Sequence, residues 1–112
     1  MEAESGRDYF QVYVTAPSED EAGSLGRMAV ERRLAACAQV SGPLSSTYWW
    51  EGEVMSAPEY LCTLKTRSDR LPALMEAVKE AHSYEVPEIV AVPIAAGDSA
   101  YLAWIEDETR EG

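Results

Sequence analysis

The stretch HSYEVPEIVAVPI, residues 82–94, decides how this chain folds, because it joins an amphipathic helix to an apolar strand. It contains His82, the only histidine, so any imidazole chemistry near neutral pH must use that residue. The strand is predicted over 88–95 and, being apolar on both faces, is expected in the centre of a sheet. Pro93 falls inside it and cannot donate to a ladder, which indicates a bulge or a change of pairing partner.

The helix before this stretch carries the strongest periodic pattern in the chain. Ser68-Asp69 predicts its N-cap, and Pro72 is tolerated in the first turn. Its apolar positions follow helical spacing: Leu71, Leu74, Met75, Val78 and His82. After the strand, Gly97-Asp98 predicts the start of a last helix.

The first half of the chain predicts one strand and one helix. Residues 9–16 alternate as a strand that ends at Pro17. Ser18 and Glu21 form a capping-box pattern, so a helix should run from there to about Leu34. Its buried stripe is expected to contain Ala22, Leu25, Ala29 and Leu34.

The middle of the chain predicts a long β-hairpin. Residues 35–40 lead into a strand that Ser41-Gly42-Pro43 breaks, and a further strand section follows over 44–54. A turn is expected over 55–58 and a returning strand over 59–66. Aromatic side chains point to both faces of this hairpin although one sheet covers only one face. A second subunit is therefore expected to cover the other face.

The order β-α-β-β-α-β plus a C-terminal helix predicts an α+β fold, with two helices on one face of an antiparallel sheet. A single domain is expected over 9–107, with a flexible N-terminus over 1–8 and a frayed tail over 108–112.

Amino-acid composition and net charge limit which classes of molecule this protein is expected to bind. Apolar residues make up 46 % and charged residues 26 % of the 112 residues, as in ordinary globular proteins. The net charge of −11 argues against nucleic acid and anionic membranes as partners. No run approaches membrane length, and Cys37 and Cys62 form no disulfide framework. We expect a cytoplasmic protein in which Cys37 is buried and Cys62 is more accessible.

Five motifs in this order resemble the CutA family of divalent-cation tolerance proteins. They cover about residues 9–107 and read LAAC (34–37), STYWWEG (46–52), Glu59 with LKT (64–66), HSYEVPEI (82–89) and YLAWI (101–105). The resemblance implies a ferredoxin-like subunit in a homotrimer that is similar to the PII signalling proteins. It also implies binding of copper or another divalent cation and a role in metal tolerance.

The candidate metal ligands depart from the pattern of copper-binding members of that family. Val14 stands where those members can carry a cysteine, and Ala81 stands where some carry a first histidine, so His82 alone remains. His82 either ligates a cation or bonds neighbouring backbone at the helix end. A neighbouring subunit could complete a Cu(II) or other divalent-cation site with carboxylates. The residues concerned are Glu59, Glu85 and Glu88.

An intersubunit cleft is the second candidate site. Lys65 and Glu59 share one face of the returning strand, and Lys65 is expected either to pair across a subunit boundary with Glu59 or Glu88 or to line a polar cleft between subunits. The cleft is expected to be lined by Tyr48, Trp50, Glu59, Lys65, Tyr84 and Glu88.

Two functions follow from these candidates. The first is divalent-cation binding in metal homeostasis. The alternative is a PII-like signalling or scaffold trimer that holds a small anion or a protein partner near Lys65. No Gly-rich phosphate loop supports nucleotide binding, and no catalytic constellation predicts an enzyme.

Overall fold

The computed structural model describes residues 9–110, so the predicted N-terminus 1–8 and the last two residues of the predicted tail lie outside the described residues. The elements are β1 (Tyr9–Ala16), α2 (Glu19–Glu31), β2 (Cys37–Trp50), β3 (Glu53–Arg67), α3 (Leu71–Ala81), β4 (Ile89–Pro93) and α4 (Ser99–Glu108). The four strands form one antiparallel sheet in the order β2-β3-β1-β4.

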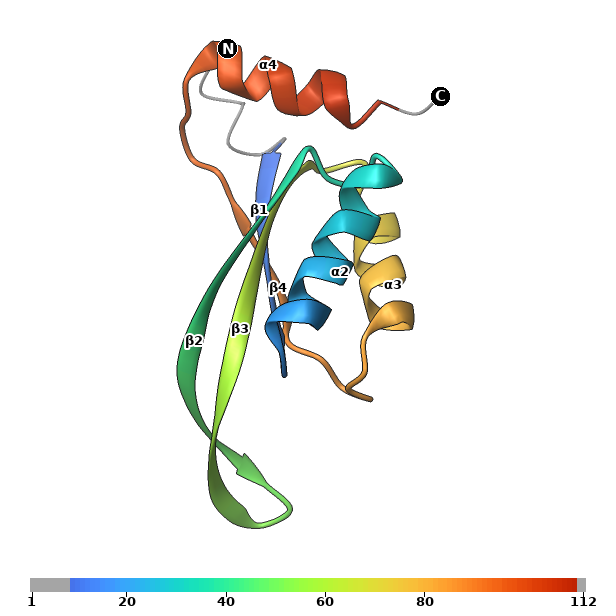
Figure 1. The fold of residues 1–112 in the computed structure, drawn as a ribbon. Coiled ribbons are helices and arrows are strands. Elements are labelled where there is room, and N and C mark those ends of the chain that lie inside the picture. The colour runs from blue at the N-terminus through green and yellow to red at the C-terminus, as the bar shows by residue number, and fades with distance from the viewer. Residues whose placement is uncertain (1–8, 111–112) are drawn as a thin grey trace.

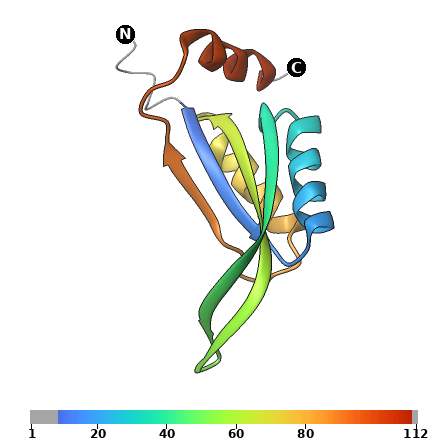
Figure 2. The ribbon, with the colours of Figure 1, turned by 60° about the vertical axis from the view of Figure 1, so that its left-hand side comes forward.

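The helices are divided between one face and one end of the sheet. Helices α2 and α3 lie side by side over one face, and α4 lies at the end opposite the tip of the hairpin (Figure 1, Figure 2). Within residues 9–110, the other face carries no helix. This arrangement confirms the predicted α+β, ferredoxin-like fold with a long protruding hairpin.

The core lies between the sheet and helices α2 and α3. Val12 of β1 pairs with Leu64 of β3 and with Ala91 of β4, and both Val12 and Leu64 are fully buried. The predicted stripe residues Ala22, Leu25 and Ala29 of α2 are buried, and so is Leu34, which follows the helix. Leu74 and Val78 of α3 are also buried. Burying one such side chain stabilises the fold by about 1.5–3 kcal/mol relative to exposing it.

The hairpin is longer and more continuous than the sequence predicted. Strand β2 runs through the expected break at Ser41-Gly42-Pro43, which is instead a register shift between Ser41 and Leu44. The expected turn over 55–58 is also wrong. The chain reverses at Glu51-Gly52, whose φ angles of 51° and 79° are those of a primed hairpin turn.

Pro58 therefore lies within β3, where it was expected to belong to a turn. Strand β1 pairs with β3 only from Tyr60 onward, so at Pro58 β3 has a neighbour on one side only. A proline is tolerated in such an edge segment because a residue with no strand on one side needs no N–H donor on that side. The tip of the hairpin, residues 44–59, thus extends beyond the four-stranded part of the sheet (Figure 1).

The expected central position of the strand at residues 88–95 is also wrong, because β4 lies at the edge of the sheet. Ile89 and Ala91 pack against the helix-covered core, whereas Val90 and Val92 are 46 % and 40 % exposed. Because this strand has apolar residues on both faces, the sequence predicted that other elements would cover both faces. In the single chain, α2 and α3 cover only one of them. Pro93 is the last residue of the strand.

Two of the three helices have the N-cap residue that the sequence predicted. The Ser18 Oγ accepts the Glu21 N–H at 3.1 Å, and Asp98 accepts the Tyr101 N–H at 3.1 Å. Helix α3 instead begins after Arg70, without a side-chain cap and with a proline in its first turn. Helix α2 ends at Glu31, three residues before the predicted end.

The predicted frayed tail begins with ordered residues. Thr109 is fully buried, and its hydroxyl donates to the Ile105 carbonyl at 2.7 Å. The packed part of the chain therefore extends beyond residue 107.

We expect two glycines of α2 to respond oppositely to alanine. A Cβ at Gly26 would lie 2.7 Å from the Ala38 Cβ and 3.2 Å from the Cys62 Sγ, whereas a Cβ at Gly23 would meet nothing within 4 Å. Gly26→Ala should lower the free energy of unfolding by about 1–3 kcal/mol through overpacking. Gly23→Ala should raise it by about 0.5–1 kcal/mol through helix propensity. Urea unfolding measures both, and a stabilised Gly26→Ala variant would contradict the close packing.

Candidate functional site

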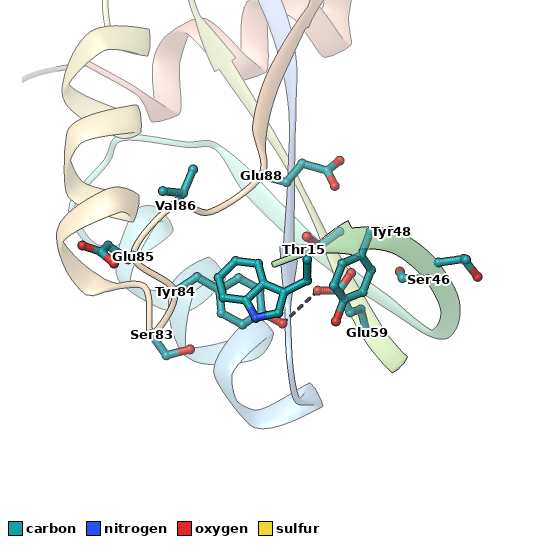
Figure 3. A pocket seen from close by; sticks show the side chains of 11 residues that line it. Thr15, Ser46, Tyr48, Glu59, Ser83, Tyr84, Glu85, Val86 and Glu88 are labelled. Atoms are coloured by element: carbon teal, nitrogen blue, oxygen red, sulfur yellow. Dashed lines mark hydrogen bonds between the residues drawn. The ribbon is translucent and has the colours of Figure 1, made fainter. Parts of the chain in front are cut away.

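A cavity of about 790 Å³ lies between the tip of the hairpin and the loop that follows α3. Figure 3 shows its wall, with Tyr48 and Glu59 from the hairpin on one side and residues of the loop on the other. The lining residues are Thr15, Ser46, Thr47, Tyr48, Trp50, Glu59, Ser83, Tyr84, Glu85, Val86 and Glu88.

His82 fixes the base of the loop. It is the C-cap residue of α3, and its side chain is fully buried. The Tyr84 N–H donates to His82 Nδ1 at 3.0 Å, so Nε2 carries the proton and donates to the Thr15 carbonyl at 2.7 Å. Both ring nitrogens are therefore engaged with backbone groups, one from β1 and one from the loop.

Glu21 holds the same loop from the start of α2. Its Oε2 accepts the Ser83 N–H at 2.8 Å and lies 3.4 Å from His82 Nδ1. The capping box predicted that this carboxylate would turn back toward the N-cap. Glu21 instead reaches across to residues more than sixty positions later in the chain. The start of α2 thus becomes a support for the loop.

Tyr84 connects the loop to the hairpin. Its hydroxyl donates to Glu59 Oε2 at 2.8 Å (Figure 3). Its ring centroid lies 4.8 Å from that of His82. Burial first, and then the hydrogen bond to the Glu59 carboxylate, together raise the pKa of Tyr84 to about 12. The phenol therefore stays protonated as a donor at neutral pH.

The structure brings five of the six expected cleft residues together within one chain. Tyr48, Trp50, Glu59, Tyr84 and Glu88 line the cavity, and so does Glu85, which was a candidate metal ligand. Lys65 does not line it. The Lys65 ammonium donates to Gln39 Oε1 at 2.9 Å within its own chain, and its pairing with Glu59 or Glu88 of a neighbouring subunit stays a prediction.

The separation of Lys65 from the cavity has a simple geometric reason. Residues 59 and 65 share a strand face, but six residues of strand span about 20 Å. Lys65 pairs with Gln11 and Cys37 in the four-stranded part of the sheet, whereas Glu59 begins the protruding tip. Sharing a face therefore did not mean sharing a site.

Other residues of the site were missed from the sequence. Thr15 contributes a carbonyl from the middle of a strand pattern, and Glu21 was interpreted only as part of a helix cap. Ser46, Thr47, Ser83 and Val86 also line the cavity. No local pattern distinguishes such residues, because their role depends on which distant segment they meet.

The residues of one subunit do not fit a metal ion well. Within residues 9–110, no group of three or more His, Cys, Asp or Glu side chains is placed to hold a metal. Zinc and copper sites usually need three or four such ligands. His82 is present, but backbone groups already use both of its nitrogens.

The two thiols are placed opposite to expectation. Cys62 is fully buried, and burial raises the pKa of its thiol to about 11. Cys37 is only partly buried, and its Sγ lies 3.7 Å from the Tyr101 hydroxyl. The alternation along the hairpin did not identify the helix-covered face on which Cys62 lies.

The helices α2, α3 and α4, which are all the helices within the described residues, are each too short or too polar to cross a membrane.

Comparison with known proteins identifies the family. Residues 10–108 match the CutA1 divalent ion tolerance protein family. The chain belongs to this family. The match spans nearly every described residue of this CutA1 chain, from β1 to the end of α4.

Relatives support the assignment in sequence and in structure. The divalent-cation tolerance protein CutA of Thermus thermophilus is 46 % identical over 98 residues, which cover 88 % of this chain and 95 % of the relative. Protein CutA 1, chloroplastic, of Oryza sativa is 43 % identical over 100 residues, which cover 89 % of this chain but 56 % of the relative. This CutA1 chain thus spans about half the length of that longer relative.

Solved structures share the fold throughout. The Oryza sativa CutA1 structure has a TM-score of 0.90 at 41 % identity, with 94 % of this chain and 96 % of that chain covered. A protein from Archaeoglobus fulgidus, described as a periplasmic divalent cation tolerance protein CutA, has a TM-score of 0.88 at 37 % identity. The alignment covers 91 % of this chain and 99 % of that one.

His82→Ala should destabilise the fold by about 2–4 kcal/mol. The change empties a buried position and leaves the Thr15 carbonyl and the Tyr84 N–H without their partner. Urea unfolding measures the loss. Lys79→Ala, at an exposed position of the same helix, is the control and should change stability by no more than about 0.5 kcal/mol. Equal losses of unfolding free energy in the two variants would show that the hydrogen bonds of His82 to Thr15 and Tyr84 do not stabilise the fold.

Cys62 should resist thiol reagents in the native protein. Burial raises its pKa, so the reactive thiolate is scarce below about pH 11 and the reagent lacks access. Because the folded pKa exceeds the ordinary value, the stability contributed by this group is lost as pH rises toward 11. Titration with a chromogenic disulfide near neutral pH should detect fewer than two thiols per native chain and two after denaturation. Rapid native labelling that Cys62→Ala abolishes would contradict this expectation.

Proposed function

We propose that this protein serves in tolerance of divalent cations and acts as a homotrimer that binds such an ion, with copper(II) as the first candidate. Family membership supports the role in tolerance, because relatives of this chain carry that name. Charge supports the binding of cations. The sequence has a net charge of −11, and the described cavity is lined by three glutamates and by no lysine or arginine.

The proposed cation contacts are the cavity carboxylates Glu59, Glu85 and Glu88. One subunit does not group three ligands within the described residues, so further ligands would come from a neighbouring subunit. We leave His82 out of this site because backbone groups occupy both ring nitrogens. Carboxylate oxygens without imidazole are a weaker ligand set for copper(II), so we expect moderate affinity.

Two open strand edges support the proposed homotrimer. Among the described residues, β2 and β4 are the two edge strands of the sheet, and the face of the sheet away from α2 and α3 exposes Val90 and Val92. The tip of the hairpin adds Trp49, which is 73 % exposed, and Val54, which is 58 % exposed. Long uncovered edges with apolar side chains favour association with another chain. Because the two edges differ, joining β2 of one subunit to β4 of the next gives head-to-tail contacts that can close into a ring.

The cytoplasm is the proposed location. Cys37 and Cys62 are both free thiols, which fits a reducing compartment. The names of relatives include other locations, since one is described as periplasmic and another as chloroplastic. Fractionation of the source cells would distinguish these locations.

Native mass spectrometry during a copper(II) titration tests both parts of this proposal. We expect the mass of three 12.3 kDa chains and saturable copper uptake. The double variant Glu59→Gln/Glu88→Gln should weaken uptake about tenfold, which corresponds to about 1.4 kcal/mol. The matched control is Glu76→Gln/Glu80→Gln, which removes the same charge from exposed positions of α3.

Two results would overturn the proposal. A monomer mass at micromolar concentration would contradict the homotrimer. Equal weakening in both double variants would mean that copper is attracted diffusely by the acidic surface and not by the cavity carboxylates.

A further inference from the structure

The cavity is lined both by aromatic rings and by carboxylates. Tyr48, Trp50 and Tyr84 supply three aromatic rings, and Glu59, Glu85 and Glu88 supply three carboxylates. We propose that this cavity binds an organic ammonium ion, namely an alkylated amine whose positive charge is spread over a methylated or methylene-substituted nitrogen.

The aromatic side is suited to a diffuse cation. Trp50 and Tyr48 both line the cavity, and both are large and mostly apolar. The faces of tryptophan and tyrosine attract ammonium groups through the ring quadrupole, and aromatic cages recognise quaternary ammonium ligands in this way. An alkylated ammonium also buries its carbon atoms against these rings, which a hydrated metal ion cannot do.

The charge of the cavity favours the same ligand. No lysine, arginine or histidine is among the described residues that line it, and Lys65 is held elsewhere by Gln39. A small anion, which the sequence suggested through Lys65, would therefore meet carboxylates and no fixed positive charge. The Glu59 carboxylate lies 2.8 Å from the Tyr84 hydroxyl, so a negative charge stands beside this aromatic ring.

The size of the cavity favours a small molecule as an occupant that one chain can hold without ligands from a neighbour. Small-molecule pockets have volumes of about 300–1,000 Å³, and this cavity of about 790 Å³ falls in that range. A metal ion needs several donor atoms around one point, and no such group of three side chains exists within residues 9–110. An ammonium ion needs only nearby rings and a carboxylate.

The walls are already held in place. Tyr84 is anchored at both ends, since its N–H bonds to His82 and its hydroxyl bonds to Glu59 Oε2. The Glu21 carboxylate fixes the adjacent Ser83 N–H. Figure 3 shows the resulting contact between the loop and the hairpin across the cavity. A pre-formed site loses less conformational entropy when it binds, so even a small ligand can gain measurable affinity.

A pair of isosteric ligands tests the proposal on the unaltered protein. Choline and 3,3-dimethylbutan-1-ol have nearly the same shape, but only choline carries a positive nitrogen. Calorimetric titration should give saturable binding of choline and at least about tenfold weaker binding of the neutral alcohol. Equal affinities, or no saturable binding of choline, would overturn the proposal.

Adjacent tryptophans provide matched variants. Trp50 lines the cavity, whereas Trp49 does not and is 73 % exposed. Trp50→Leu keeps an apolar side chain but removes the ring, and should weaken choline binding about tenfold. Trp49→Leu should leave it unchanged. Glu88→Gln, at an exposed lining position, should also weaken choline binding, and should leave binding of the neutral alcohol unaffected.

Equal effects of Trp49→Leu and Trp50→Leu would overturn the assignment to this cavity. If Trp50→Leu fails to fold, Glu88→Gln and the isostere comparison still decide the question. The proposal does not rest on copper binding, because choline is titrated in metal-free buffer containing a chelator. A protein that binds choline but not copper(II), or the reverse, would separate the two proposals.

Discussion

The fold depends on one buried imidazole at the point where three segments meet. His82 donates to the last part of β1 through the Thr15 carbonyl and accepts the Tyr84 N–H of the following loop. The Glu21 carboxylate of α2 lies against the same ring and holds Ser83. A buried polar group is costly unless its hydrogen bonds are made, so these contacts constrain where the loop can run.

This joint has a functional consequence. It holds Tyr84 toward the hairpin, where the phenol bonds Glu59 and closes one side of the cavity. The same bonds use both nitrogens of the only histidine in the sequence, which removes it from the simplest metal chemistry. A single residue thus explains why the site has a stable wall and why its polar groups are mainly carboxylates and hydroxyls. His82 acts on the cavity indirectly, by positioning Tyr84 beside Glu59.

Local patterns predicted most elements because their causes are local. Helix caps at Ser18 and Asp98 and the buried stripes of α2 and α3 depend on residues within a few positions of each other. The errors lie where distant pairing overrides local chemistry. Pro58 signals a turn in isolation, yet it is accommodated in β3 because β1 does not reach that part of the strand.

The site shows the same division. Five expected cleft residues line the cavity. The motifs around residues 48, 59 and 84 lie in the hairpin and in the loop after α3, which are the two segments that form it. Thr15 and Glu21 were missed, and Lys65 lies away from the cavity of its own chain, because face and spacing along one strand do not give distance from a site.

By itself, the sequence determined the order of the elements, the α+β class and the acidic character of the protein, since these follow from periodicity, caps and composition. Tertiary structure alone decided that β4 lies at the edge, that the hairpin turns at Glu51-Gly52, and that Glu21, His82 and Tyr84 form one joint. The physical reason is that hydrogen-bond partners and buried faces are chosen between segments far apart in the chain, where local preference gives no distance.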